Sequence, residues 1–180
     1  MKEDTKVIQT ITNVAIFRLL YLAVILCSNL KVWTKIILIA AFDYIEGRII
    51  CLFANQEVNF NSNHYYQSFD KFNDTVENGV ILYLIYSNNL LSPYYTKLIA
   101  FAYFYRVIGV TLNLVFKKDR KILLYFPDIF KELLLISYLS QFQFNNNTKL
   151  FTILVLLAIV IKIYIEYLFH YKKTNFTKNS

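Results

Sequence analysis

The chain has 180 residues, a formal net charge of +7 and a hydrophobic content of 57%. Its apolar residues come in long blocks, which excludes the three-in-seven pattern of a soluble surface helix over most of the chain. Cys27 and Cys51 have no metal-ligand spacing, and His64 and His170 stand alone, so the sequence excludes a zinc site.

Six apolar segments approach the length of about 20 residues that a membrane-spanning helix needs. In chain order they cover residues 14–28, 32–54, 72–91, 95–116, 122–142 and 150–171. No internal repeat or low-complexity linker separates them, so we expect residues 1–180 to form a single membrane-embedded domain. The sequence therefore predicts an all-α polytopic membrane protein, built as a bundle of six transmembrane helices. The alternative is a soluble all-α bundle with an unusually apolar core.

The first segment, residues 14–28, carries Arg18 and lacks the small-x-small site at which a signal peptide is cleaved. We therefore expect it to remain as the first span. Pro127 lies inside or near the start of the fifth segment, where proline can kink a helix. No paired half-repeats or broken helices, which are typical of transporters, are evident along the chain.

The positively charged residues indicate which side of the membrane the connections occupy. With six spans, both termini share one side with the second and fourth connections. Eleven Lys and Arg residues lie on that side: Lys2, Lys6, Arg48, Lys71, Lys117, Lys118, Arg120, Lys121, Lys172, Lys173 and Lys178. The other side has four: Lys31, Lys35, Lys97 and Lys149. This asymmetry predicts cytoplasmic termini, with basic stretches next to anionic headgroups, so the positive charge requires no nucleic-acid partner.

Four acidic residues lie where the second span leaves the membrane and the third span enters it. Asp43 and Glu46 are three positions apart, and Asp70 and Asp74 are four apart, so each pair shares a helix face. Glu77 follows one turn later. Two adjacent antiparallel helices would bring the four carboxylates of the two pairs to one depth.

Four carboxylates cannot all ionise at close range unless cations intervene, and an all-oxygen set suits hard cations such as Mg²⁺ or Mn²⁺. Two such ions could hold and polarise a diphosphate, while one carboxylate takes a proton from an attacking hydroxyl. Gly47 would leave room for a bulky ligand near the backbone, and Arg48 and Arg106 could face the phosphates.

Ion pairing inside the bundle is an alternative explanation for these acids. The candidate bases within the spans are Arg18, Arg106, Lys131 and Lys162. In the sixth span, Lys162 and Glu166 are four positions apart and are expected to form an internal pair.

The acidic pattern resembles the signature of the CDP-alcohol phosphotransferase (CDP-alcohol phosphatidyltransferase) family, which are six-helix membrane enzymes that make phospholipids. That signature is D-x-x-D-G-x-x-A-R, followed after a short gap by G-x-x-x-D-x-x-x-D. In this chain DYIEG, residues 43–47, resembles the first half, and DKFND, residues 70–74, resembles the second half. The opening TITNVAIFRLLYLAVI is similar to the family's first helix, and Arg18 matches its arginine.

The resemblance implies transfer of a phosphatidyl or phosphoalcohol group from a CDP-linked donor to an alcohol acceptor, with release of CMP. It implies a two-ion Mg²⁺ or Mn²⁺ site held by Asp43, Glu46, Asp70 and Asp74. Asp74, which matches the last Asp of the signature, would be the base that activates the acceptor hydroxyl. The active face would be cytoplasmic, and a homodimer is compatible with this organisation.

Several positions depart from the signature. Glu46 replaces the second Asp, Ile50 and Cys51 replace the A-R pair, and Tyr66 replaces the Gly of the second half. Two alternatives therefore stay open. One is a catalytically inactive structural or lipid-binding protein of the same fold, and the other is a small transporter or channel subunit whose acids carry ions or protons.

Overall fold

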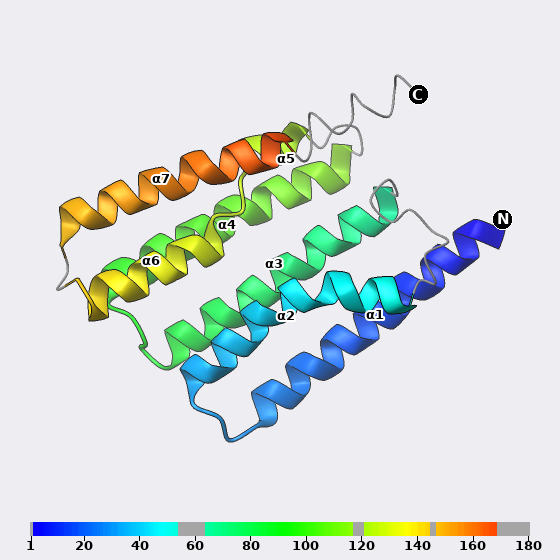
Figure 1. Cartoon of the computed structure of the whole chain (residues 1–180), viewed down its shortest axis with the longest axis horizontal. Coiled ribbons are helices and arrows are strands. Elements are labelled where there is room, and N and C mark those ends of the chain that lie inside the picture. Colours follow the sequence, from blue (N-terminus) through cyan, green and yellow to red (C-terminus); the bar gives the residue numbers. More distant parts are fainter. Residues whose placement is uncertain (1, 54–63, 117–120, 145–146, 169–180) are drawn as a thin grey trace. The chain divides into compact units, whose positions relative to one another are not determined.

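The computed structural model describes residues 2–53, 64–116, 121–144 and 147–168, and every regular element among them is a helix. For residues 2–8, 10–11, 43–53, 64–70 and 121, the description covers the backbone alone. The helices follow one another along the described residues as α1 Lys2–Cys27, α2 Val32–Phe53, α3 His64–Ser87, α4 Pro93–Phe116, α5 Lys121–Tyr125, α6 Phe130–Phe142 and α7 Thr148–Tyr167 (Figure 1). The predicted all-α class is confirmed over these described ranges.

The chain divides into two compact units, Met1–Leu84 and Ile85–Ser180, and the boundary falls inside α3. The first unit holds α1, α2 and most of α3, and the second holds α4 to α7. The prediction that residues 1–180 form a single domain stays a prediction.

Aromatic packing and hydrogen bonds to backbone carbonyls pair α1 with α2. The Tyr21 ring stacks on Phe42 with ring centroids 4.0 Å apart, and its hydroxyl donates to the Leu38 carbonyl at 2.7 Å. The Lys35 ammonium donates to the carbonyl of Leu26 at 2.8 Å, near the end of α1. Carbonyls at a helix C-terminus lack an intrahelical partner, so this lysine both caps α1 and joins it to α2.

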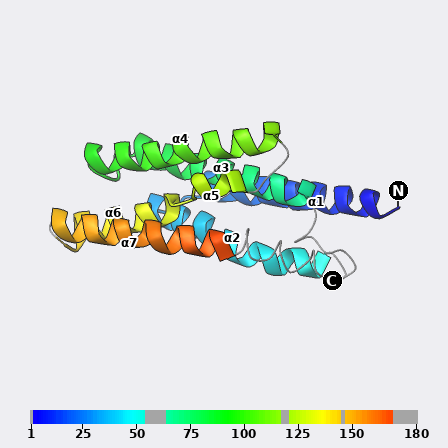
Figure 2. The ribbon, with the colours of Figure 1, turned by 90° about the horizontal axis from the view of Figure 1, so that it is seen from above.

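In the second unit, α6 packs against both α4 and α7 (Figures 1 and 2). Tyr95 of α4 joins the three helices: its hydroxyl lies 2.7 Å from Ser140 Oγ, and its ring centroid lies 5.1 Å from that of Phe151. Close by in sequence, the Gln141 side chain accepts a hydrogen bond from the Ser92 N–H at 2.7 Å. Polar contacts therefore fix the end of this unit where α4 begins.

The fifth predicted span, residues 122–142, is interrupted, which corrects the prediction of one continuous helix. α5 ends at Tyr125 and α6 begins at Phe130, with residues 126–129 between them. Pro127 explains the interruption, because it has no N–H to donate and disfavours the helical conformation of the residue before it. The expectation that the chain contains no broken helix was therefore wrong.

Two helices in the described part of the chain, α4 and α7, are long and apolar enough to cross a membrane. The apolar stretches of α1 and α2 are shorter, Thr12–Cys27 and Val32–Phe42. Only 6% of the most apolar window of α7 is buried, so its apolar side chains face outward, unlike those of a core helix in a soluble protein. A bundle of six spans is not confirmed by these helices.

Candidate functional site

The middle of α3 buries a row of polar side chains. Asp74, Glu77 and Asn78 share one face of the helix, because they are three and four positions apart, and all three are buried. Burying a carboxylate is unfavourable unless a cation or a hydrogen-bond donor faces it. The structure supplies cations from α1 and from α3 itself.

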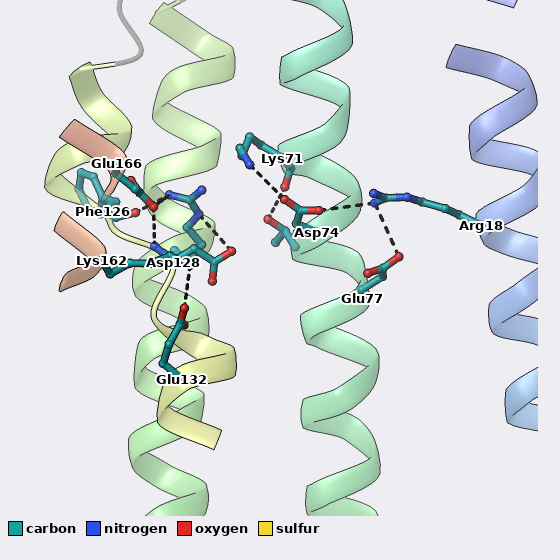
Figure 3. Close-up of polar contacts among 11 residues, drawn as sticks. Arg18, Lys71, Asp74, Glu77, Phe126, Asp128, Glu132, Lys162 and Glu166 are labelled. Atoms are coloured by element: carbon teal, nitrogen blue, oxygen red, sulfur yellow. Dashed lines mark hydrogen bonds and ion pairs between the residues drawn. The ribbon is translucent and has the colours of Figure 1, made fainter. Parts of the chain in front are cut away.

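Arg18 of α1 lies between the two carboxylates of this row (Figure 3). Its Nη1 is 3.6 Å from Asp74 Oδ1 and 3.6 Å from Glu77 Oε1. The Arg18 side chain is 3% exposed, so both ion pairs are shielded from the water that weakens surface pairs. The alternative that acids inside the chain pair with its buried bases is confirmed for Arg18.

Lys71 supplies a second cation to Asp74. Its Nζ lies 3.3 Å from Asp74 Oδ2, at the i, i+3 spacing that brings side chains together on a helix surface. The Lys71 side chain is 25% exposed, so its ammonium group, unlike the Arg18 guanidinium, reaches solvent. Asp74 therefore has a buried guanidinium at one oxygen and a partly solvated ammonium at the other.

For most of the predicted site residues, the structure describes the backbone but not the side chain. Asp43, Glu46, Gly47 and Arg48 lie in the second half of α2, and Asp70 lies in α3, where only the backbone is described. The backbone at both acidic pairs is helical, in α2 and in α3, and the shared face of each pair stays a prediction. The convergence of the four carboxylates stays a prediction.

Among the four predicted metal ligands, Asp74 is the one whose side chain the structure describes. Among the described side chains, no group of three or more His, Cys, Asp or Glu residues could hold a metal ion. The chemistry of Asp74 nevertheless suits a hard divalent cation, because it offers carboxylate oxygens. Oxygen ligands lie about 2.0–2.6 Å from such ions, so an ion at Oδ2 would require the Lys71 ammonium to move away.

A second buried ion cluster joins α4, α7 and the break between α5 and α6 (Figure 3). Arg106 Nε lies 3.9 Å from Asp128 Oδ2, and Arg106 Nη1 lies 4.0 Å from Glu166 Oε1. The same Nη1 donates to the Phe126 carbonyl, and Glu166 Oε1 accepts the Asp128 N–H at 3.1 Å. Side chains from neighbouring helices thus satisfy backbone groups that the break removes from the helical pattern.

The partners in this unit differ from those suggested by sequence. Lys162 Nζ lies 2.8 Å from Glu132 Oε1 of α6, whereas Glu166 faces Arg106 and the broken segment. The expected Lys162–Glu166 pair therefore gives way to contacts between helices. The role of Arg106 in binding a substrate phosphate stays a prediction, and two carboxylates of its own unit already face its guanidinium group.

Sequence reasoning did not single out Asp128 and Glu132. Their four-residue spacing directly after Pro127 was a signal that could have found them, because it places two acids at a proline in an apolar segment. It could not identify their partners, which come from α4 and α7.

Over its described residues the chain therefore belongs to the class of helical proteins with buried ion pairs inside each of its two units, and α4 and α7 are apolar enough to cross a membrane. Comparison with protein-family models, with curated proteins and with solved structures finds no match to the chain. The resemblance to CDP-alcohol phosphotransferases therefore rests on the residues and motifs quoted above.

Proposed function

We propose that the chain is a multi-pass membrane protein whose outward-facing apolar side chains contact lipid. The support comes from α7, which exposes large apolar side chains along its length: Ile153, Leu156, Leu157, Val160, Ile161 and Tyr164. Removing such surface from water is favourable by roughly 25 cal/mol per Å². The six spans and cytoplasmic termini predicted from sequence belong to this proposal.

The activity we propose is a divalent-metal-dependent transfer of a phosphatidyl or phosphoalcohol group from a CDP-linked donor to an alcohol, with release of CMP. The observation that supports it is the buried contact of Arg18 with Asp74 and Glu77. This contact joins the first and third helices, which are two of the three segments that carry the family resemblance. A polar contact between the same segments is what a shared site would require.

In this proposal each residue has a separate task. Asp74 accepts the proton of the acceptor hydroxyl, and Arg18 holds its carboxylate in position. Mg²⁺ or Mn²⁺, bound by Asp74 together with Asp43, Glu46 and Asp70, would supply charge stabilisation for the diphosphate. Gly47 leaves the backbone open to the donor.

Two arginines were predicted to face the phosphates. Arg48 follows Gly47 directly and is retained for this role in the proposal, whereas Arg106 already faces two carboxylates of the second unit. The cytoplasmic face of the membrane would hold the site, and a homodimer is compatible with it.

The test is CMP release by the purified protein in liposomes, with CDP-diacylglycerol, CDP-choline or CDP-ethanolamine, a panel of alcohols, and Mg²⁺ or Mn²⁺. We expect alcohol-dependent CMP release that falls by about 10²-fold or more in Asp74→Asn, because the amide cannot act as a base. Glu132→Gln is the matched control. It makes the same carboxylate-to-amide change in the second unit and should retain most of the activity.

Folded protein that releases no CMP with any donor and alcohol would contradict this activity. It would favour the catalytically inactive alternative, for which the ion pairs of Asp74 with Arg18 and Lys71 are a structural role in themselves. Equal activity of Asp74→Asn and Glu132→Gln would instead reject Asp74 as the base.

One observation favours a second candidate function, a small transporter or channel subunit. Arg106 lies 13 residues after the start of α4 and 10 residues before its end, which is about 20 and 15 Å along the helix. If α4 crosses a membrane, the Arg106 cluster and the broken helix therefore lie near mid-depth. Ionisable groups and interrupted helices at that depth are typical of ion and substrate pathways.

Ion flux distinguishes this candidate from the transferase. Liposomes containing the protein would be loaded with a pH-sensitive dye and exposed to a proton or cation gradient. Flux that is reduced in Glu166→Gln but retained in Asp74→Asn would support transport through the second unit. Dye signals equal to those of protein-free liposomes would rule this candidate out.

A further inference from the structure

Some of the exposed polar side chains of α4 and α7 have their hydrogen-bond partner inside the protein. The Thr111 and Thr152 hydroxyls each donate at 2.8 Å to the carbonyl four positions earlier in their own helix. The Tyr105 hydroxyl donates at 2.6 Å to the Tyr125 carbonyl in the same unit. Hydroxyls satisfied in this way can lie against lipid, where no water is present to bond them.

Three other exposed polar side chains of these helices lack such a partner. They are Tyr94 and Lys97 in the first turns of α4 and Lys149 in the first turn of α7. Within the described part of the chain, the Tyr94 hydroxyl and the two ammonium groups make no hydrogen bond or ion pair. These groups therefore depend on the surroundings of the protein for their partners.

The packing of the second unit places the beginnings of α4 and α7 at the same end (Figure 1). The ring centroid of Tyr94 lies 6.4 Å from that of Phe151, which is in the first turn of α7. Tyr94, Lys97 and Lys149 therefore share one end of the unit. Beyond this end, as far as Ile161 of α7, the exposed side chains of that helix are apolar or bonded internally.

The chemistry of this end fits the headgroup region of a bilayer. Tyrosine is enriched there because its ring is apolar and its hydroxyl is polar. A lysine stem lies along apolar surface while its ammonium extends to water and to anionic phosphate. Lipid phosphate complements this end of the unit, because it offers negative charge to the two ammonium groups and acceptor oxygens to the phenol.

We propose that Tyr94, Lys97 and Lys149 form a surface that binds lipid phosphate and fixes the depth of α4 and α7 in the bilayer. The inference rests on the proposed function in taking these helices as spans. Arg106 follows Lys97 by nine positions, which is about 14 Å along α4. The hydrocarbon core is about 30 Å thick, so headgroup contact at Lys97 puts the Arg106 cluster near its centre.

The first experiment measures which residues lie at headgroup level. Spin labels are attached to Lys97→Cys, Lys149→Cys, Phe104→Cys and Leu157→Cys, one at a time, after both native cysteines are replaced by alanine. The liposomes contain phosphatidylcholine, phosphatidylglycerol and a lipid whose headgroup chelates Ni²⁺, which shortens the relaxation of nearby labels. We expect a severalfold larger effect at the two lysine positions than at the matched exposed positions, which lie about 10 and 12 Å further along the same helices.

Equal nickel effects at Lys97→Cys and Phe104→Cys overturn the inference. Labels at Lys97 and Lys149 that respond only to a water-soluble nickel complex overturn it as well, because these residues would then lie beyond the headgroups. If the Phe104 and Leu157 labels also respond to the soluble complex as labels in bulk water do, the helices are not in the bilayer. That result rejects the proposed membrane function itself, so the two failures are distinguishable.

The second experiment tests the contact with phosphate. Solid-state magnetic resonance detects lysine ¹⁵Nζ signals that lipid ³¹P dephases, and these signals should decrease in the Lys97→Gln/Lys149→Gln double variant. Lys162→Gln is the control, because the Lys162 ammonium already donates to Glu132 at 2.8 Å and should contribute no dephased signal. A double variant that loses no more dephased signal than the control overturns the contact with phosphate.

Discussion

At the scale of single residues, charge pairing and steric fit decide which side chains the interior accepts. Arg18 and Arg106 each lie in an apolar helix. Arg18 faces two carboxylates of α3, and Arg106 faces one carboxylate of the break between α5 and α6 and one of α7. Removing one member of a buried pair leaves an uncompensated charge, which is more damaging than loss of a surface pair. Substitution of either arginine is therefore expected to destabilise the protein, whether or not the residue has a catalytic role.

Substitution of Gly109 is expected to destabilise the protein for a different reason, which is steric overlap. A Cβ built on Gly109 would fall against Phe126 Cβ and lie 2.6 Å from Phe126 Cγ. Phe126 Cβ is fixed to the backbone, so rotation of the side chain cannot relieve its overlap with the added Cβ, and the broken segment itself would have to shift.

We predict that Gly109→Ala lowers the stability of the protein by about 1–3 kcal/mol, the usual effect of overpacking. The measurement is the thermal unfolding midpoint of detergent-purified protein, followed by circular dichroism. Thr111→Ala, an exposed change on the same helix, should alter stability by no more than about 0.5 kcal/mol. An unchanged midpoint in Gly109→Ala would show that α4 does not approach Phe126 this closely.

At the scale of elements, the break between α5 and α6 depends on side chains supplied by other helices. The Tyr105 hydroxyl donates to the Tyr125 carbonyl at 2.6 Å, Arg106 donates to the Phe126 carbonyl, and Glu166 accepts the Asp128 N–H. Unpaired backbone groups are unfavourable in apolar surroundings, so these three contacts are what make a non-helical segment acceptable there.

This account predicts an order of stability for two substitutions of Glu166. Glu166→Ala removes both the acceptor for the Asp128 N–H and one negative charge near Arg106, and should destabilise the protein by about 2 kcal/mol. Glu166→Gln keeps a carbonyl oxygen for the Asp128 N–H, so we expect a smaller loss. Thermal unfolding checks the order, with exposed Ile165→Ala as the control. A glutamine variant as unstable as the alanine variant would argue against the hydrogen bond to Asp128.

At the scale of the whole molecule, the apolar surface decides the environment in which the chain can exist. The exposed side of α7 consists of large aliphatic and aromatic side chains, and α4 exposes Phe101, Phe104 and Ile108. A water-soluble protein rarely exposes so large an apolar surface. The proposed lipid contact accounts for this surface.

We predict that Leu157→Asp impairs membrane insertion of α7. Leu157 is 53% exposed and is the tenth of the 20 residues of the helix, so a charge there would lie near the middle of a span. An Asp at a span centre costs about 2.5–3.5 kcal/mol on insertion scales. Alkaline extraction of membranes should release more of this variant than of Lys149→Asp, which changes the first turn. Identical extraction of the two variants would contradict a transmembrane α7.

What the sequence determined by itself was the helical class of the described elements and the presence of a proline, Pro127, that can bend a helix in the fifth apolar segment. Long apolar blocks favour helices because a helix satisfies its own backbone, and Pro127 interrupts one because it lacks an N–H. These are local effects, readable from neighbours in the chain.

What only the tertiary structure decided was the choice of partners. The sequence offered Asp74 either a metal or a buried base, and it paired Lys162 with Glu166 by spacing alone. The structure puts Arg18 and Lys71 beside Asp74 and turns Lys162 toward Glu132. Such pairing depends on the distance between atoms of different helices, and attraction between charges falls with that distance and with exposure to water. The spacing of residues along one helix gives neither the distance between atoms of different helices nor their exposure to water.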